Sequence, residues 1–138
     1  MKQTSVVRNL TLWSVDRQPI DTFIRYDIAD PYAVTLEFVD DHGRTTVSYL
    51  FGRELLIDGL HELVGQDLVV VGPHDADGYT TLSLTPEHGA LPMDFYVATA
   101  VLTEFVEASC QLVASGSERF HLSIDQVIAH LLHGRWAA

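Results

Sequence analysis

Hydrophobic and polar side chains alternate along much of the first hundred residues, which is the pattern of β-strands that bury one face. From Tyr32 to Phe38 every second residue is large and apolar, and small or polar residues stand between them. Turn-forming residues separate such segments, as in Asp41-His42-Gly43 and Asp75-Ala76-Asp77-Gly78. We therefore predict strands over residues 6–15, 22–28, 32–38, 45–51, 67–71, 79–85 and 91–97.

The apolar spacing changes to three and four residues in three places, which favours amphipathic helices. After Gly52, leucines four residues apart predict a short helix that ends near Gly59. Residues 102–113 carry a second apolar stripe, and a third begins at Ser123, where Gln126 completes a capping box. The whole chain, residues 1–138, is therefore predicted to be one α+β domain. It would combine a strongly bent antiparallel sheet of about seven strands with one short mid-chain helix and two C-terminal helices.

The predicted strand over residues 67–71 differs from the others, because Leu68-Val69-Val70-Val71 is apolar without alternation. Such a run is typical of a strand that is buried on both faces. The second face could be covered within the chain or in a subunit interface, and the pattern alone leaves both open.

The net charge of the chain limits the classes of molecule that it is expected to bind. The chain has 19 acidic residues against 8 Lys and Arg, a net charge of −11 with His neutral, and Lys2 is the single lysine. Binding to phosphate backbones or to anionic membranes depends on clustered Lys and Arg, so neither is expected. No apolar run reaches the length of about 18 residues that membrane insertion needs. With one cysteine, Cys110, and no apolar N-terminal stretch, we expect a cytoplasmic protein without an internal disulfide.

Two groups of side chains could hold a metal ion. His130 and His133 are three residues apart on the last predicted helix, with Asp125 or His121 as a third ligand. A solvated helix end, where His favours the helix dipole, explains the same pair. Asp75 and Asp77 resemble the start of a calcium loop, but its remaining ligands are missing and a hairpin turn explains them. We therefore predict no metal and no cofactor.

Asp27 and Asp30 could form a carboxylate pair for acid–base chemistry. The structural alternative is an ion pair between Arg25 and Asp27, with Asp30 capping the turn before Pro31. Nucleotide-binding glycine loops and the G-x-S-x-G nucleophile motif are absent from the sequence. We therefore predict no catalytic residues.

Two longer motifs carry a family resemblance. The segment R-Y-D-x-A-D-P-Y-A-V over residues 25–34, followed by F-x-R-[DE]-L-L-x-x-G-L over residues 51–60, resembles the SsgA-like family of sporulation and cell-division regulators of actinobacteria. The strand 68–73 departs from the family pattern, which often has a polar or Arg residue and a Trp there. The resemblance implies structural or partner-facing roles for Arg25, Tyr26, Asp27, Asp30, Pro31, Tyr32, Phe51, Arg53, Leu55, Leu56, Gly59 and Leu60.

The resemblance also implies a fold similar to the Whirly-type nucleic-acid binders, assembly as a homotrimer, and a non-enzymatic role in septum formation. Such a protein would bind other proteins of the division machinery, either the tubulin-like ring GTPase FtsZ or a septal membrane partner, and would be recruited to the septum. The alternative is a single-stranded nucleic-acid-binding protein, which the fold analogy favours and the net charge opposes. A small-molecule enzyme ranks third.

Overall fold

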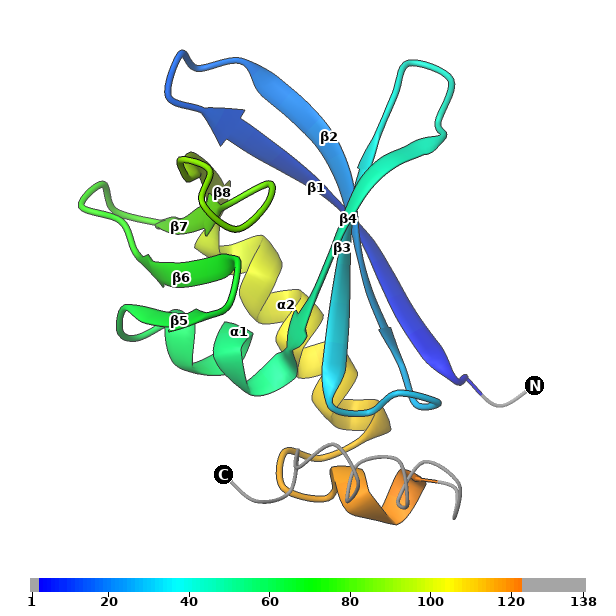
Figure 1. Ribbon diagram of the computed structural model, residues 1–138. Helices are drawn as coiled ribbons and strands as arrows, with labels where there is room; N and C mark the ends of the chain where they lie inside the picture. Colours follow the sequence, from blue (N-terminus) through cyan, green and yellow to red (C-terminus); the bar gives the residue numbers. More distant parts are fainter. Residues whose placement is uncertain (1–2, 123–138) are drawn as a thin grey trace.

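The computed structural model describes residues 3–122, which form one antiparallel sheet and the helices packed against it (Figure 1). The sheet has eight strands in the order β4-β3-β2-β1-β8-β7-β6-β5. The strands are β1 (Ser5–Ser14), β2 (Pro19–Asp27), β3 (Ala33–Val39), β4 (Thr45–Gly52), β5 (Val64–Gln66), β6 (Val69–Pro73), β7 (Tyr79–Leu84) and β8 (Met93–Ala98).

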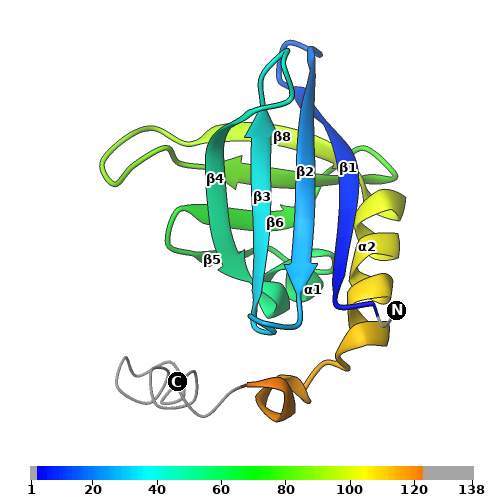
Figure 2. The same cartoon turned by 90° about the vertical axis from the view of Figure 1, so that its right-hand side faces the viewer.

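The sheet bends where β1 meets β8. Strand β1 pairs with β2 from Ser5 to Trp13, but it pairs with β8 only at Trp13 and Ser14. The two halves of the sheet are therefore joined by a short stretch of strand pairing, and strands β1–β4 run across strands β5–β8 (Figures 1 and 2). The buried apolar side chains of both halves form one core.

Two α-helices and one 3-10 helix complete the described residues: α1 (Arg53–Gly59), α2 (Thr99–Leu112) and η1 (Glu118–His121). Helix α2 buries Leu102, Phe105 and Val106 in the core. On its outer side Arg8 Nε lies 2.9 Å from Glu104 Oε2, which ties β1 to α2. The hydrogen bond from Arg8 lowers the pKa of Glu104.

The predicted strand alternation is confirmed. In β1 the side chains of Val6, Leu10 and Leu12 are buried, whereas Val7 and Trp13 on the other face are exposed. All seven predicted strands are present with ends shifted by a few residues. The number of strands is nevertheless one too low, because β5 has only three residues around Gly65 and shows no alternation. The mid-chain helix and the helix over residues 102–113 are confirmed, and the predicted helix from Ser123 lies outside the described residues.

The strand predicted from residues 67–71 starts later, at Val69, because Asp67 has a positive φ of 52° in the turn before it. Val69 and Val71 are buried, but Leu68 and Val70 are only partly buried. Of the two alternatives, burial of both faces within the chain is therefore met only in part. The alternative, a face covered in a subunit interface, remains a prediction.

Gly59 at the end of α1 allows the helix to lie directly on β6. A Cβ atom built on Gly59 would overlap Cβ and Cγ1 of Val71 and would lie 3.2 Å from the Val71 backbone carbon. Any side chain at residue 59 would therefore push α1 away from the sheet. This close approach explains why the motif has glycine at this position.

Replacing Gly59 with alanine should destabilise the protein, although helix propensity alone would favour alanine by about 1 kcal/mol. The overlap with Val71 should cost about 1–3 kcal/mol, which exceeds that gain in most of the range. Equilibrium denaturation measures the difference, and Asp58→Ala at an exposed position of the same helix is the control. Unchanged stability of Gly59→Ala would contradict the packing argument, and Val71→Ala should relieve part of the cost in the double variant.

Candidate functional site

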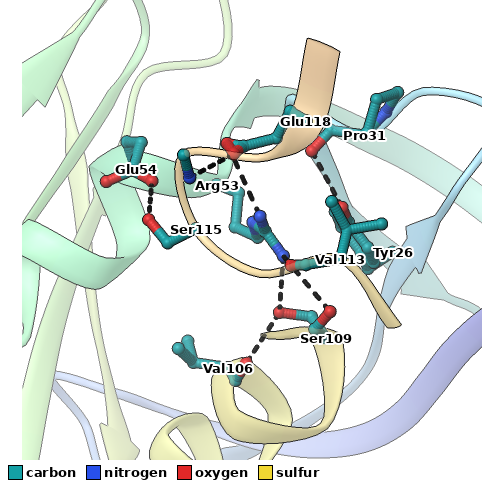
Figure 3. A network of polar contacts seen from close by, with 10 residues as sticks. Tyr26, Pro31, Arg53, Glu54, Val106, Ser109, Val113, Ser115 and Glu118 are labelled. Atoms are coloured by element: carbon teal, nitrogen blue, oxygen red, sulfur yellow. Dashed lines mark hydrogen bonds and ion pairs between the residues drawn. The ribbon is translucent and has the colours of Figure 1, made fainter. Parts of the chain in front are cut away.

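The two sequence motifs meet at the side chain of Arg53, the first residue of α1. Its side chain is 1% exposed, and its backbone N–H donates to the Tyr32 carbonyl over 2.8 Å. Nη1 of Arg53 donates to the carbonyl oxygens of Val113 at 2.7 Å and Ser109 at 3.2 Å. Arg53 therefore binds the C-terminal end of α2 to the start of α1 (Figure 3).

Glu118 supplies the opposite charge. Its Oε2 lies 3.5 Å from Arg53 Nη2, and the Glu118 side chain is only 4% exposed. Oε1 of Glu118 accepts a hydrogen bond of 2.5 Å from the Gly116 N–H. Within the described residues, Nε and Nη2 of Arg53 have no hydrogen-bond acceptor. The ion pair is thus buried but not fully hydrogen-bonded.

The third contact of Arg53 is aromatic. The guanidinium carbon lies 4.6 Å from the centre of the Tyr26 ring, within the range of a cation–π interaction. Burial raises the pKa of Tyr26 to about 12, and the charge of Arg53 opposes this shift. The hydroxyl stays protonated at neutral pH and donates to the Pro31 carbonyl over 2.9 Å. We call Tyr26, Arg53, Ser109, Val113 and Glu118 the Arg53 cluster.

The predicted ion pair between Arg25 and Asp27 is wrong. Arg25 Nη2 instead lies 3.4 Å from Glu37 Oε1 on the neighbouring strand β3. Arg25 is paired with Thr35, so Glu37 is its diagonal neighbour across β2 and β3, and at about 7–8 Å such a neighbour is within reach of a long side chain. The predicted turn cap is also displaced, because the backbone N–H of Ala29 donates to Asp27 Oδ1 at 2.8 Å. Asp30 contributes its backbone carbonyl, which accepts from the Ala33 N–H at 3.2 Å.

Most of the other motif residues are in or beside the core. Phe51, Leu56, Gly59 and Pro31 are buried, and Tyr32, Leu55 and Leu60 are partly buried. The two motif arginines differ in exposure. The side chain of Arg25 is 51% exposed, whereas that of Arg53 is 1% exposed. The structure therefore gives the motif residues mainly a role in holding the fold together, while partner-facing roles for them stay a prediction.

The candidates for metal binding within residues 3–122 do not form a shared site. In the part of the chain that the structure describes, no three His, Cys, Asp or Glu side chains are placed to share a metal ion. Asp75 and Asp77 are exposed in the turn between β6 and β7, and His121 is exposed in η1. His130, His133 and Asp125 lie outside the described residues.

Sequence reasoning missed Glu118 and Ser109. Both are polar and buried, but the sequence around them does not show that they face Arg53. It also missed the 2.5 Å contact between His88 Nε2 and Asp67 Oδ1, which joins the β7–β8 loop to the β5–β6 turn. Within residues 3–122, no helix has the length and hydrophobicity to cross a bilayer.

Replacing Arg53 with leucine should destabilise the protein by about 3–5 kcal/mol, because Glu118 would remain buried without a counter-charge. Arg25→Leu is the matched control, because Arg25 is 51% exposed and its pair with Glu37 should be worth only about 1 kcal/mol. Glu118→Gln should cost a similar amount, about 3–5 kcal/mol, because it leaves the Arg53 guanidinium buried without a counter-charge. Chemical denaturation of the three variants checks the order. Equal effects of Arg53→Leu and Arg25→Leu would refute the structural role of the cluster.

Comparison with known proteins places these features in a family. The sequence profile of the family described as "Streptomyces sporulation and cell division protein, SsgA" matches residues 20–118. The matched range contains both motifs and ends at the buried Glu118. A curated relative, the sporulation-specific cell division protein SsgB of Salinispora tropica, is 39% identical over 121 residues, which cover 85% of this chain and 82% of the relative.

Two solved structures have a similar fold. A structure reported with SsgB mutations that correlate with longitudinal cell division in Streptomyces coelicolor superposes with a TM-score of 0.72 and 30% identity, covering 86% of this chain and 96% of that one. An SsgA-like sporulation-specific cell division protein of Thermobifida fusca gives a TM-score of 0.74 and 28% identity, covering 94% of this chain and 98% of that one. Both are SsgA-like proteins, and the likeness to the Whirly-type fold stays a prediction. The buried motifs, the bent sheet and these similarities together show that the chain belongs to the SsgA family of sporulation and cell-division proteins.

Proposed function

We propose that this chain is a non-enzymatic adaptor in septum formation during sporulation-associated cell division. It would be cytoplasmic, would be recruited to the septum, and would bind a protein of the division machinery, either the FtsZ ring or a septal membrane partner. The observation that carries the proposal is the similarity to the SsgB of Salinispora tropica, which is named a sporulation-specific cell division protein and of which this chain covers 82%.

The geometry supports binding rather than catalysis. The motif residues are used to pack the fold, and the ionisable pair Arg53–Glu118 is buried where a substrate has no access. The outer face of the bent sheet, by contrast, exposes apolar side chains among polar ones, including Val7, Trp13 and Leu50. A mixed apolar and polar surface on a rigid domain is typical of non-obligate protein interfaces.

The alternative function, binding of single-stranded nucleic acid, would need basic side chains along a groove. The net charge of −11 works against it. Binding to single-stranded DNA in the low micromolar range, weakened by salt, would shift the conclusion to this alternative.

The adaptor role predicts a cellular phenotype. A fluorescent fusion of the chain should concentrate at nascent septa, and deletion of its gene should disturb septation or spore formation while growth metabolism continues. Time-lapse microscopy of both strains measures this. The Asp75→Asn/Asp77→Asn variant is a suitable control, because it changes an exposed turn outside the motifs and should keep the fold and the localisation. Diffuse fluorescence together with normal division in the deletion strain would reject the role.

The chain should also form a homotrimer. Leu63 and Leu91 are 75% and 86% exposed, and Leu68 and Val70 keep part of their surface uncovered, so the β5–β8 half of the sheet has apolar area for a subunit contact. Sedimentation velocity at micromolar concentration should give about three times the mass of one chain. A single species of monomer mass at that concentration would refute the assembly.

A further inference from the structure

The sheet opens at one end between two hairpins. The ladder between β2 and β3 ends at the pair Thr22 and Phe38, whereas β2 continues to pair with β1 as far as Pro19. Strand β3 has an irregularity in its pairing with β4 between Phe38 and Val39. Beyond these points the β1–β2 and β3–β4 hairpins diverge, as Figure 1 shows at its top. Residues Pro19–Asp21 therefore lack a strand partner on the β3 side.

A groove of about 550 Å³ lies between the two hairpins. Its apolar lining is Ile20, Phe23 and Val39, which are all partly buried. Its acidic lining is Asp21, Asp40 and Asp41. We call this site the hairpin groove. The groove is open to solvent on one side, which suits the side chains of a bound segment better than an enclosed small ligand.

The charge of the hairpin groove is only partly neutralised. Asp40 is engaged within its own turn, where Oδ1 accepts from the backbone N–H groups of His42 at 2.8 Å and Arg44 at 3.0 Å. Arg44 Nε also lies 3.7 Å from Asp40 Oδ2. Asp21 and Asp41 are exposed, and their carboxylates have no hydrogen bond or ion pair within residues 3–122. Among the described residues that line the groove there is no lysine or arginine.

We propose that the hairpin groove is the docking site for a partner-protein segment that carries an arginine or lysine beside an apolar residue. This inference rests on the adaptor function proposed above. The apolar side chain would pack on Phe23 and Val39, and the cation would lie between Asp21 and Asp41. Acidic groups that face a cationic partner speed association and select against acidic competitors. An anionic nucleic acid or membrane surface would be repelled by the same groups.

A second copy of this chain fits the groove less well than such a partner. The chain carries 8 Lys and Arg against 19 acidic residues, so two copies repel one another over most of their surfaces. Charge complementarity therefore selects a basic heterologous partner as the occupant.

Three labelled ten-residue peptides test the docking chemistry on the full chain by fluorescence anisotropy. One alternates arginine and leucine, one replaces arginine with glutamate, and one replaces leucine with serine. The arginine–leucine peptide should bind at least about tenfold more tightly than either control, with an affinity that falls as salt rises. Its binding should shift the amide resonances of residues 19–23 and 39–44. Absence of binding, or equal binding of the serine peptide, would overturn the proposal.

Matched variants test the position. Asp21→Asn with Asp41→Asn should weaken the arginine–leucine peptide about tenfold. Asp75→Asn with Asp77→Asn removes the same charge from another exposed turn and should change the affinity less than about twofold. Phe23→Thr keeps a strand-forming residue and should also weaken binding. An equal loss of affinity in the two double variants would mean that only the overall charge of the chain matters. That result would overturn the proposal that the peptide binds in the hairpin groove.

The same variants in cells separate this inference from the adaptor function. If the unmodified chain and Asp75→Asn/Asp77→Asn reach the septum but Asp21→Asn/Asp41→Asn stays diffuse, the groove is the docking site. If all three reach the septum and divide normally, the groove proposal fails while the adaptor function stands. If the unmodified chain stays diffuse, the adaptor function fails, and the peptide titrations still decide whether the groove binds basic segments.

Discussion

The rest of the structure depends on the burial of one positive charge, that of Arg53. A guanidinium removed from water is strongly destabilising unless acceptors, a counter-charge and good packing surround it. Here two carbonyl oxygens near the end of α2, the carboxylate of Glu118 and the ring of Tyr26 provide that environment. Because these groups come from α2, η1 and β2, the charge is compensated only when all three elements are docked on α1. The Arg53 cluster thus makes the docking of α1, α2, η1 and β2 on one another cooperative.

The burial of Arg53 and its neighbours changes the role that the two sequence motifs can be given. Their length and order identify the family, yet the structure uses Tyr26, Pro31, Arg53 and Gly59 to close the core, where a partner cannot reach them. A motif that is mostly buried specifies the scaffold and carries little information about recognition. Exposed residues outside the motifs, at positions where alternation leaves polar side chains, are therefore candidates for the recognition surface, together with the exposed Arg25. That is the reason why the family was readable from the sequence and the contact residues were not.

The sequence predicted what depends on near neighbours in the chain. Alternation and one continuous apolar run identified seven strands, and spacings of three and four residues identified α1 and α2. Strand β5 was missed because it exists only through pairing with β6. Arg25 was assigned to Asp27, two residues away, but the strand register makes Glu37 on β3 its diagonal neighbour, and the ion pair forms there. Glu118 and the hairpin groove follow from contacts between distant segments, for which a single sequence has no local signal.

Strand β2 runs from the end of the sheet that the helices cover to the end where the two hairpins separate. Tyr26 and Asp21 lie on the same strand, β2, at a separation of about 16 Å for five residues of strand. At the Tyr26 end, α1, α2 and η1 cover the sheet and the Arg53 cluster holds them in place. At the Asp21 end, β2 has lost β3 as a neighbour and the hairpins separate. At this end β2 keeps β1 as a neighbour but has lost β3, so it presents one free edge in a defined orientation. Such a preorganised edge loses little conformational entropy when a partner binds, which favours recognition at the open end.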